Sequence, residues 1–319
     1  MWRPPRGAAV TLSDRLAPEV GRLRLGDELS VNRLGFGTMQ LPGPGVFGPP
    51  DDHAGALAVL RRAVELGVNY LDTSDFYGPH VTNDLIREAL HPYPDDLVIG
   101  TKIGVERDRW GDFVPAGAPD QLRRQVEENL RRLGRDRLEL AYLRVGGDGL
   151  LRPGDVRFSE SFAMMVRLRE EGLIGDVGLS GVTVRQLDQA RATIPIAAVQ
   201  NRFHLLDRDC LDVLRRCAEE DIAFVPYFPL AAGLLGTRHG RPPLPFGPEV
   251  SAAQRRTVDG IADAHGATRA QVAIAWLLAY SPTVLVIPGT SSVRHLEENM
   301  AAARLRLTPA DRAALDALA

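Results

Sequence analysis

The chain has 319 residues, 45% hydrophobic and 25% charged, so it can bury a sizeable core as one large α/β domain or two ordinary ones. Its net charge of −3 argues against nucleic acid or an anionic membrane as a partner, because arginines alternate with acids along the expected helices. No apolar stretch of the sequence reaches membrane-spanning length, so we expect a cytoplasmic protein. The sequence does not indicate an oligomeric state, and a monomer is the default expectation.

Short apolar runs alternate with longer segments of helical periodicity about eight times. The expected strands cover residues 34–38, 68–73, 97–103, 138–143, 174–179, 197–200, 222–227 and 283–287. The expected helices cover residues 52–66, 83–90, 119–133, 161–171, 184–192, 209–220, 251–265, 269–279 and 293–303. Eight strand–helix units of this length predict a (β/α)8 TIM barrel.

The chain ahead of the first unit is expected to serve the barrel. Residues 1–20 are typical of an N-terminal extension, and residues 22–32 of a β-hairpin that closes the bottom of the barrel. No domain boundary is evident later, so we expect residues 21–319 to form a single barrel domain.

An open doubly wound sheet is the main competing fold, and it would bind a dinucleotide at a glycine-rich turn. Residues 43–48 fit the spelling G-x-G-x-x-G. However, prolines at 42, 44, 49 and 50 prevent a helix from beginning on these glycines, so the phosphate-binding geometry is absent. A Gly/Pro-rich loop is the better interpretation.

Cysteine use does not indicate a disulfide or a metal site. Cys210 and Cys217 lie seven residues apart in one expected helix, a rise of roughly 10 Å that is beyond disulfide reach. Neither has the close Cys or His spacing of a zinc site. We expect buried free thiols and no bound metal.

Polar residues stand where the expected strands end, which is where a barrel of this kind places its active site. They are Gly37-Thr38-Met39, Asp72 with Tyr77, Lys102, Arg144, Ser180-Gly181, Gln200-Asn201, Tyr227 and Gly289-Thr290-Ser291. A carboxylate, a phenol and an amine that converge can build one proton donor with a tuned pKa. Asp72, Tyr77 and Lys102 are therefore the candidate catalytic trio.

Five segments carry a family resemblance. They are residues 71–78, 101–102, 177–180, 199–201 and 287–292, in this order and at barrel spacing. Together they resemble the aldo-keto reductase superfamily over residues 22–303. Residues 78–83, 92–96, 143–144 with 147–149, and 228–230 are most similar to the bacterial pyridoxal reductases, also called pyridoxine 4-dehydrogenases.

The resemblance implies an oxidoreductase that transfers hydride from a nicotinamide to a small aldehyde or ketone, with pyridoxal as one candidate substrate. Tyr77 would be the proton donor, Lys102 would tune its pKa, and Asp72 would hold Lys102 in place. Members of the family usually have a histidine where this chain has Arg144. Arginine cannot shuttle a proton, so we expect Arg144 to orient the carbonyl.

The resemblance also implies a set of cofactor-binding residues. Ser180, Gly181 and Gln200 would hold the nicotinamide carboxamide, although many relatives have asparagine at the position of Gly181. Tyr227 would stack on the nicotinamide, and Gly233 belongs to a loop over the pyrophosphate. The other expected contacts are Gly37, Thr38, Met39, Asp72, Phe228, Pro229, Leu230, Ile287, Gly289, Thr290, Ser291, His295, Glu298 and Asn299.

Arg294 and His295 stand where the resemblance places a 2′-phosphate, so we predict NADPH rather than NADH. His80 and Trp110 are candidate substrate contacts from neighbouring loops, although a surface position for His80 and a loop anchor for Trp110 remain open. A second function stays open beside the reductase. Because the usual histidine is missing, the chain could be a cofactor-binding, redox-sensing or regulatory subunit with little catalysis.

Overall fold

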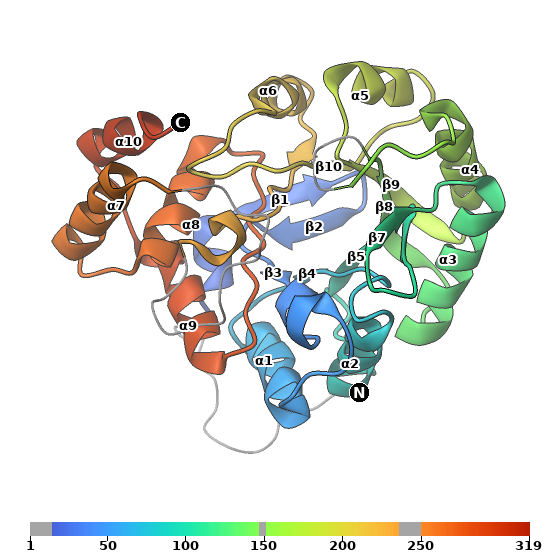
Figure 1. The fold of residues 1–319 in the computed structure, drawn as a ribbon, viewed down its shortest axis with the longest axis horizontal. Helices are drawn as coiled ribbons and strands as arrows, with labels where there is room; N and C mark the ends of the chain where they lie inside the picture. The colour runs from blue at the N-terminus through green and yellow to red at the C-terminus, as the bar shows by residue number, and fades with distance from the viewer. Residues whose placement is uncertain (1–14, 147–150, 236–249) are drawn as a thin grey trace.

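A computed structural model describes residues 15–146, 151–235 and 250–319 (Figure 1). The first fourteen residues of the expected extension lie outside this part. The rest of the extension packs on the protein. Leu16 and Ala17 are buried, and Ala17 N donates a hydrogen bond to Leu66 O. A short 3-10 helix, Ala17–Val20, follows.

Seven parallel strands form one sheet in the order β11-β10-β9-β8-β5-β4-β3. Their bounds are β3 (Phe36–Gly37), β4 (Tyr70–Asp72), β5 (Val98–Ile103), β8 (Leu138–Arg144), β9 (Ile174–Ser180), β10 (Ala198–Gln200) and β11 (Ala223–Phe224). Residues 284–286 close the sheet, because Val284 bridges Phe224 and Val286 bridges Leu34. The eighth predicted strand therefore joins both edges, and the (β/α)8 barrel is confirmed.

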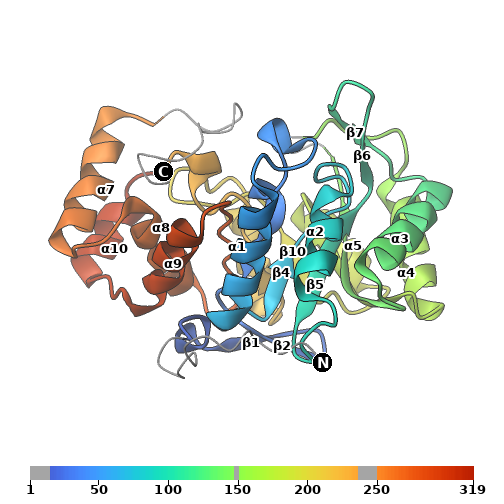
Figure 2. The same ribbon diagram turned by 90° about the horizontal axis from the view of Figure 1, so that it is seen from below.

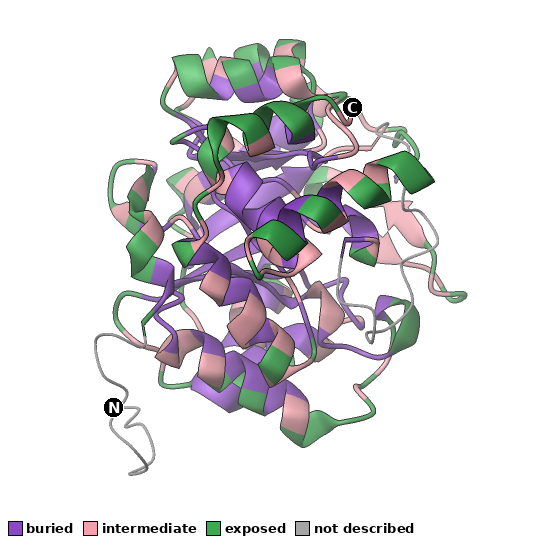
Figure 3. Cartoon of the chain, turned by 90° about the vertical axis from the view of Figure 1, so that its left-hand side faces the viewer, coloured by how far each residue is buried: buried purple, intermediate pink, exposed green. Residues whose placement is uncertain are grey.

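Helices surround the barrel (Figure 1), with buried faces toward the sheet and exposed faces outward (Figure 3). Their bounds are α1 (His53–Glu65), α2 (Val81–Leu90), α3 (Pro119–Leu133), α4 (Phe158–Glu170), α5 (Val184–Arg191), α6 (Leu211–Glu219), α7 (Ala252–Ala264), α8 (Arg269–Tyr280), α9 (Val293–Ala301) and α10 (Pro309–Asp316). Side-chain caps explain several boundaries. Asp52 accepts a hydrogen bond from Gly55 N at the start of α1, and Thr268 caps α8.

The predicted hairpin at the bottom of the barrel is present as β1 (Arg22–Leu25) and β2 (Leu29–Asn32). Leu25 and Val31 belong to the apolar cluster inside the barrel, together with Tyr70 and Tyr142. The hydroxyls of these two tyrosines lie 2.8 Å apart. The hairpin thus fills one end of the barrel and leaves the site to the other end.

Residues 104–119 connect β5 to α3. They contain a second antiparallel hairpin, β6 (Val105–Arg107) and β7 (Phe113–Pro115). Figure 2 shows this hairpin at the opposite end of the barrel from β1 and β2. It stands above the carboxyl ends of the barrel strands, beside the candidate site.

The two cysteines do not pair. Cys210 is the residue before α6, Cys217 lies within it, and both thiols are free. Burial raises the pKa of each thiol to about 12. Both groups are therefore protonated and unreactive at neutral pH.

Candidate active site

A cavity opens at the carboxyl end of the barrel, where the polar residues of several strands meet. Among its lining residues are eight that the sequence predicts for the site: Met39, Tyr77, Lys102, Arg144, Ser180, Gln200, Tyr227 and Phe228. They come from segments far apart in the sequence, between Met39 and Phe228, and the parallel barrel brings their strand ends to one edge.

Asp72 and Lys102 form a buried ion pair at the ends of β4 and β5. Lys102 Nζ lies 2.5 Å from Asp72 Oδ1 and donates a second hydrogen bond to Thr73 O at 3.0 Å. Burial disfavours the charge on Lys102, but Asp72 and Tyr77 outweigh it, so the pKa of Lys102 is raised. Lys102 therefore stays cationic at neutral pH.

Tyr77 lies beside this pair in the loop after β4. Its ring centre is 5.1 Å from Lys102 Nζ, and the side chain is buried. Burial raises the pKa of Tyr77, while Lys102 and, to a smaller extent, Arg144 act in the opposite direction. The phenol is therefore protonated at neutral pH, as a proton donor must be, and its conjugate base would face two cations.

Arg144 ends β8 opposite Ser180 of β9, and its side chain is buried. Its guanidinium carbon lies 5.2 Å from the Tyr227 ring centre. Arg144 thus reaches the cavity from the side that Tyr227 occupies. A buried guanidinium here offers several N–H donors at fixed angles to a group in the cavity.

Two buried polar atoms at the floor of the cavity have no hydrogen-bond partner in the part of the chain that the structure describes. They are Ser180 Oγ and Gln200 Oε1. Gln200 Nε2 donates to Asp72 Oδ2 at 2.7 Å, which fixes the amide with its oxygen directed elsewhere. Buried polar atoms of this kind need a partner, and a carboxamide supplies both a donor and an acceptor. The pair fits a nicotinamide.

Gly181 and Asn201 shape the loop after β9. Gly181 has φ +71°, a left-handed conformation that glycine or asparagine adopts most easily. Asn201 Oδ1 accepts hydrogen bonds from the backbone N of Gly181 and of Val182. This left-handed conformation explains why glycine can replace the asparagine of many relatives. Because glycine has no side chain, position 181 offers no amide to a ligand.

The segment after Tyr227 has an unusual backbone. Phe228, Ala231 and Ala232 all have φ between +50° and +58°, and Gly233 has φ +99°. Such conformations cluster where a chain is shaped for binding. Phe228 lines the cavity, whereas Leu230 packs on the core. Pro229 lies between them.

Two backbone segments approach closely beside the cavity. A methyl group on Gly37 would lie 2.6 Å from Ile287 O, and one on Gly289 would lie 2.6 Å from Gly37 O. Gly37 N also donates to Pro288 O. The first and last strands of the barrel therefore meet through glycine. The Thr38 hydroxyl donates to Asp72 O at 2.9 Å, which connects this seam to the catalytic strand.

The N-terminus of α9 follows residues 289–292. Ser292 caps the helix by accepting from His295 N, and Thr290 Oγ1 accepts from Ser292 N. The Arg294 side chain is exposed and donates to Glu298 and to His295 Nε2. Glu298 Oε2 is buried and accepts no hydrogen bond from the described residues. Asn299 is buried. Ser291 is exposed near the helix start.

The two residues expected to contact substrate lie away from this cavity. The Trp110 side chain is 71% exposed and stacks with the Arg109 guanidinium. His80 lines a separate pocket behind the Tyr77 loop. The apolar wall instead comes from Phe76, Val105, Phe113 and Leu151. The sequence offered one signal for this wall, the position of Phe76 next to Tyr77. The alternation of apolar and polar residues alone could not show that Phe76 lines the cavity.

Within residues 15–146, 151–235 and 250–319, no helix is long and apolar enough to cross a membrane. In the same part of the chain, no three His, Cys, Asp or Glu side chains are grouped to hold a metal ion.

The chain is similar to known reductases in sequence and in structure. The sequence model of the aldo/keto reductase family matches residues 33–319. Pyridoxine 4-dehydrogenase of Escherichia coli (strain K12) is 47% identical over 290 residues, which cover 91% of this chain and 95% of that protein.

Two solved structures share the fold. A thermostable aldo-keto reductase in complex with the inhibitor epalrestat has a TM-score of 0.76 and 27% identity, with 93% of this chain and 98% of that chain covered. An aldo/keto reductase from Klebsiella pneumoniae, in complex with NADP and acetate, has a TM-score of 0.72 and 26% identity, with 93% and 94% covered. The chain therefore belongs to the aldo/keto reductase family and is an oxidoreductase of the nicotinamide-dependent kind.

Proposed function

We propose that this enzyme is an NADPH-dependent reductase of small aldehydes, with pyridoxal as its substrate and pyridoxine as the product. One observation carries the proposal: Tyr77 and Lys102 line a cavity that also holds Arg144, and Asp72 pairs with Lys102 beside it. The relative that is 47% identical, pyridoxine 4-dehydrogenase, supports the choice of substrate.

The proton chemistry follows from the trio. When bound, the cofactor supplies the hydride that reduces the carbonyl carbon. Tyr77 then gives its phenolic proton to the carbonyl oxygen as negative charge develops there. Lys102 stabilises the phenolate that remains, since it is held cationic by Asp72. Burial of all three groups strengthens this electrostatic effect.

Arg144 supplies the substrate-orienting part of the mechanism. Pyridoxal carries a phenolate next to its aldehyde, and a guanidinium can donate to both oxygens at once. Arg144 reaches the cavity from beside Tyr227. In this proposal the arginine selects hydroxy-aldehydes, and Tyr77 alone delivers the proton.

The cofactor would lie across the open end of the barrel. Ser180 and Gln200 would hold the nicotinamide carboxamide, because their unpartnered oxygens fit it. Tyr227 would stack on the ring, with Phe228 beside it. Residues 289–292 and the start of α9 would bind the adenosine phosphate through backbone N–H groups. Arg294 and His295 would select the 2′-phosphate of NADPH, and Glu298 would accept from the adenine amine.

Oxidation of NADPH in the presence of pyridoxal tests the proposed activity. We expect Tyr77→Phe to lower kcat by about 10²–10⁴-fold with NADPH affinity unchanged, because only the transferable proton is lost. Tyr280→Phe is the matched control, since it also removes one phenol hydroxyl but lies in α8 outside the cavity. Full activity of Tyr77→Phe would remove the tyrosine from its role. NADPH binding without turnover of any aldehyde would favour the regulatory alternative.

Arg144→His tests substrate selection. We expect kcat/KM for pyridoxal to fall roughly tenfold or more, because a charge-assisted hydrogen bond is lost. An otherwise similar pyridine aldehyde without the adjacent hydroxyl should change much less. Equal effects on both aldehydes would contradict the orienting role.

A comparison of kcat/KM for NADPH and NADH, with Arg294→Met as the variant, tests the cofactor preference in the same assay.

A further inference from the structure

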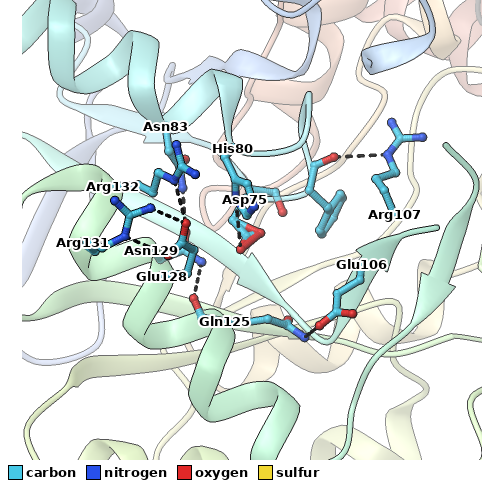
Figure 4. A network of polar contacts seen from close by, with 12 residues as sticks. Asp75, His80, Asn83, Glu106, Arg107, Gln125, Glu128, Asn129, Arg131 and Arg132 are labelled. Atoms are coloured by element: carbon cyan, nitrogen blue, oxygen red, sulfur yellow. Dashed lines mark hydrogen bonds and ion pairs between the residues drawn. The ribbon is translucent and has the colours of Figure 1, made fainter. Parts of the chain in front are cut away.

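A second pocket lies behind the Tyr77 loop and takes no part in the proposed reaction. It has a volume of about 280 Å³, and its walls include Asp75, His80, Glu106 and Glu128. Figure 4 shows these side chains around the space between the loop, β6 and α3. Phe76 lines both this pocket and the candidate active site, so the two adjoin at this residue.

The basic residues of this pocket are engaged elsewhere. Arg107 donates to the backbone oxygens of Phe76 at 3.2 Å and of Val46 at 2.9 Å, and its guanidinium stacks on Phe113. Arg124 donates to Asp120 at 2.7 Å. Both guanidiniums line the pocket, but their hydrogen bonds go to these partners and not to Asp75 or Glu106.

The acidic residues are not equally engaged. Glu128 accepts hydrogen bonds from Arg131 and from Arg132, at 2.6 and 2.7 Å. Glu106 has one long contact, from Gln125 Nε2 at 3.3 Å. Asp75 accepts no side-chain hydrogen bond from any described residue. Glu106 and Asp75 therefore keep acceptor capacity that the protein does not use.

Asp75 is the most informative of these groups, because its side chain is only 9% exposed. His80 Nδ1 lies 3.7 Å from Asp75 Oδ2, which is beyond hydrogen-bond distance. That nitrogen is itself buried and has no hydrogen-bond partner within the described ranges. A buried carboxylate without donors is costly, and a ligand with N–H groups would remove the cost.

We propose that this pocket is a second ligand site, and that it binds a small organic cation with N–H donors, a protonated amine or guanidine. Asp75 and Glu106 accept from the cation, and His80 Nδ1 accepts a further N–H. The pocket has the volume for such an ion, and no group of three metal-binding side chains occurs among the described residues. The unused acceptors of Asp75 and Glu106 match this class of ligand.

Calorimetric titration of the full chain with methylguanidinium and with methylammonium tests the site, at constant ionic strength and at about pH 8, where the Asp75 carboxyl with its pKa of about 7 is ionised. Tetramethylammonium is the matched probe, because it has the charge but no N–H donor. We expect saturable binding of at least one N–H cation and at least tenfold weaker binding of tetramethylammonium. Equal binding of all three probes, or no saturable binding of any, would overturn the proposal.

Asp75→Asn and Glu106→Gln locate the site. Each should weaken binding of the preferred probe by about tenfold, since each removes one charged acceptor. Asp95→Asn is the matched control, because Asp95 is an exposed acid in the turn before β5, at the other end of the barrel. Circular dichroism confirms that each variant is folded. Unchanged binding in both pocket variants would place the cation elsewhere. The readout is independent of aldehyde turnover, so it stands whether or not the proposed activity is found.

Discussion

Replacement of Asp75 by asparagine should change the pH dependence of stability. Burial, followed by the nearby charges of Glu128 and Glu106, raises the pKa of Asp75 from 3.8 to about 7, and Arg132 acts in the opposite direction. Asparagine has nearly the same shape but cannot ionise. The charged or titratable groups around the carboxylate are His80 of its own loop, Glu106 and Arg107 of β6, and Arg124, Glu128 and Arg132 of α3.

The sign follows from proton binding in the two states. Asp75 binds its proton more tightly in the folded protein, so its contribution to stability is complete below about pH 4 and is lost as the pH rises through about 7. The difference from 3.8 to about 7 is about three units, at about 1.4 kcal/mol each. Ionisation should therefore lower the free energy of unfolding of the wild type by about 4 kcal/mol across this range.

Urea unfolding followed by circular dichroism, at about pH 5 and about pH 8, measures this effect. Asp75→Asn lacks the ionisation, so its stability relative to the wild type should increase by a few kcal/mol between the two pH values. Asp95→Asn, which removes an exposed acid, serves as the control. If the free energies of unfolding of Asp75→Asn and the wild type differ by the same amount at both pH values, the Asp75 carboxylate is not buried without donors as described.

Three other changes test the site and the barrel. Lys102→Met should lower the free energy of unfolding by about 3–5 kcal/mol, because it leaves Asp72 buried without its cation. Much of this loss should return in the double variant Lys102→Met/Asp72→Asn, and purely additive effects would contradict the coupling. Gly37→Ala should cost about 1–3 kcal/mol in urea unfolding, since the methyl group would lie 2.6 Å from Ile287 O. Arg33→Met should cost about 2–4 kcal/mol, because the guanidinium donates to three backbone oxygens at the barrel seam; an unchanged melting temperature would show that water replaces it.

The barrel could be predicted from the sequence because its parallel strands carry apolar runs and its helices carry a regular period. The strand at 138–143 and the helix at 119–133 match β8 and α3 closely. The prediction failed for β6 and β7, whose three-residue strands alternate too briefly to register. It also omitted α10, although Thr308 and Asp311 form a capping box at its start.

The site residues on the barrel strands could be predicted in the same way, whereas those on the loops could not. The residues at strand ends reach the cavity because parallel strands end at one edge, so position along the chain was enough. Loop residues are different. Trp110 and Leu151 are both apolar and both follow a strand, yet one is exposed and the other lines the cavity. That outcome depends on how each loop folds back, which no local pattern encodes.

Asp72 has a wider role than the sequence indicated. One of its carboxylate oxygens accepts from Lys102 and the other from Gln200. The same group therefore positions the cation beside Tyr77 and orients the amide proposed to hold the nicotinamide. In the proposed function, one buried carboxylate therefore positions the groups that act on both the proton donor and the hydride donor. A change at Asp72 should affect cofactor binding and kcat together, whereas Tyr77→Phe should affect kcat alone.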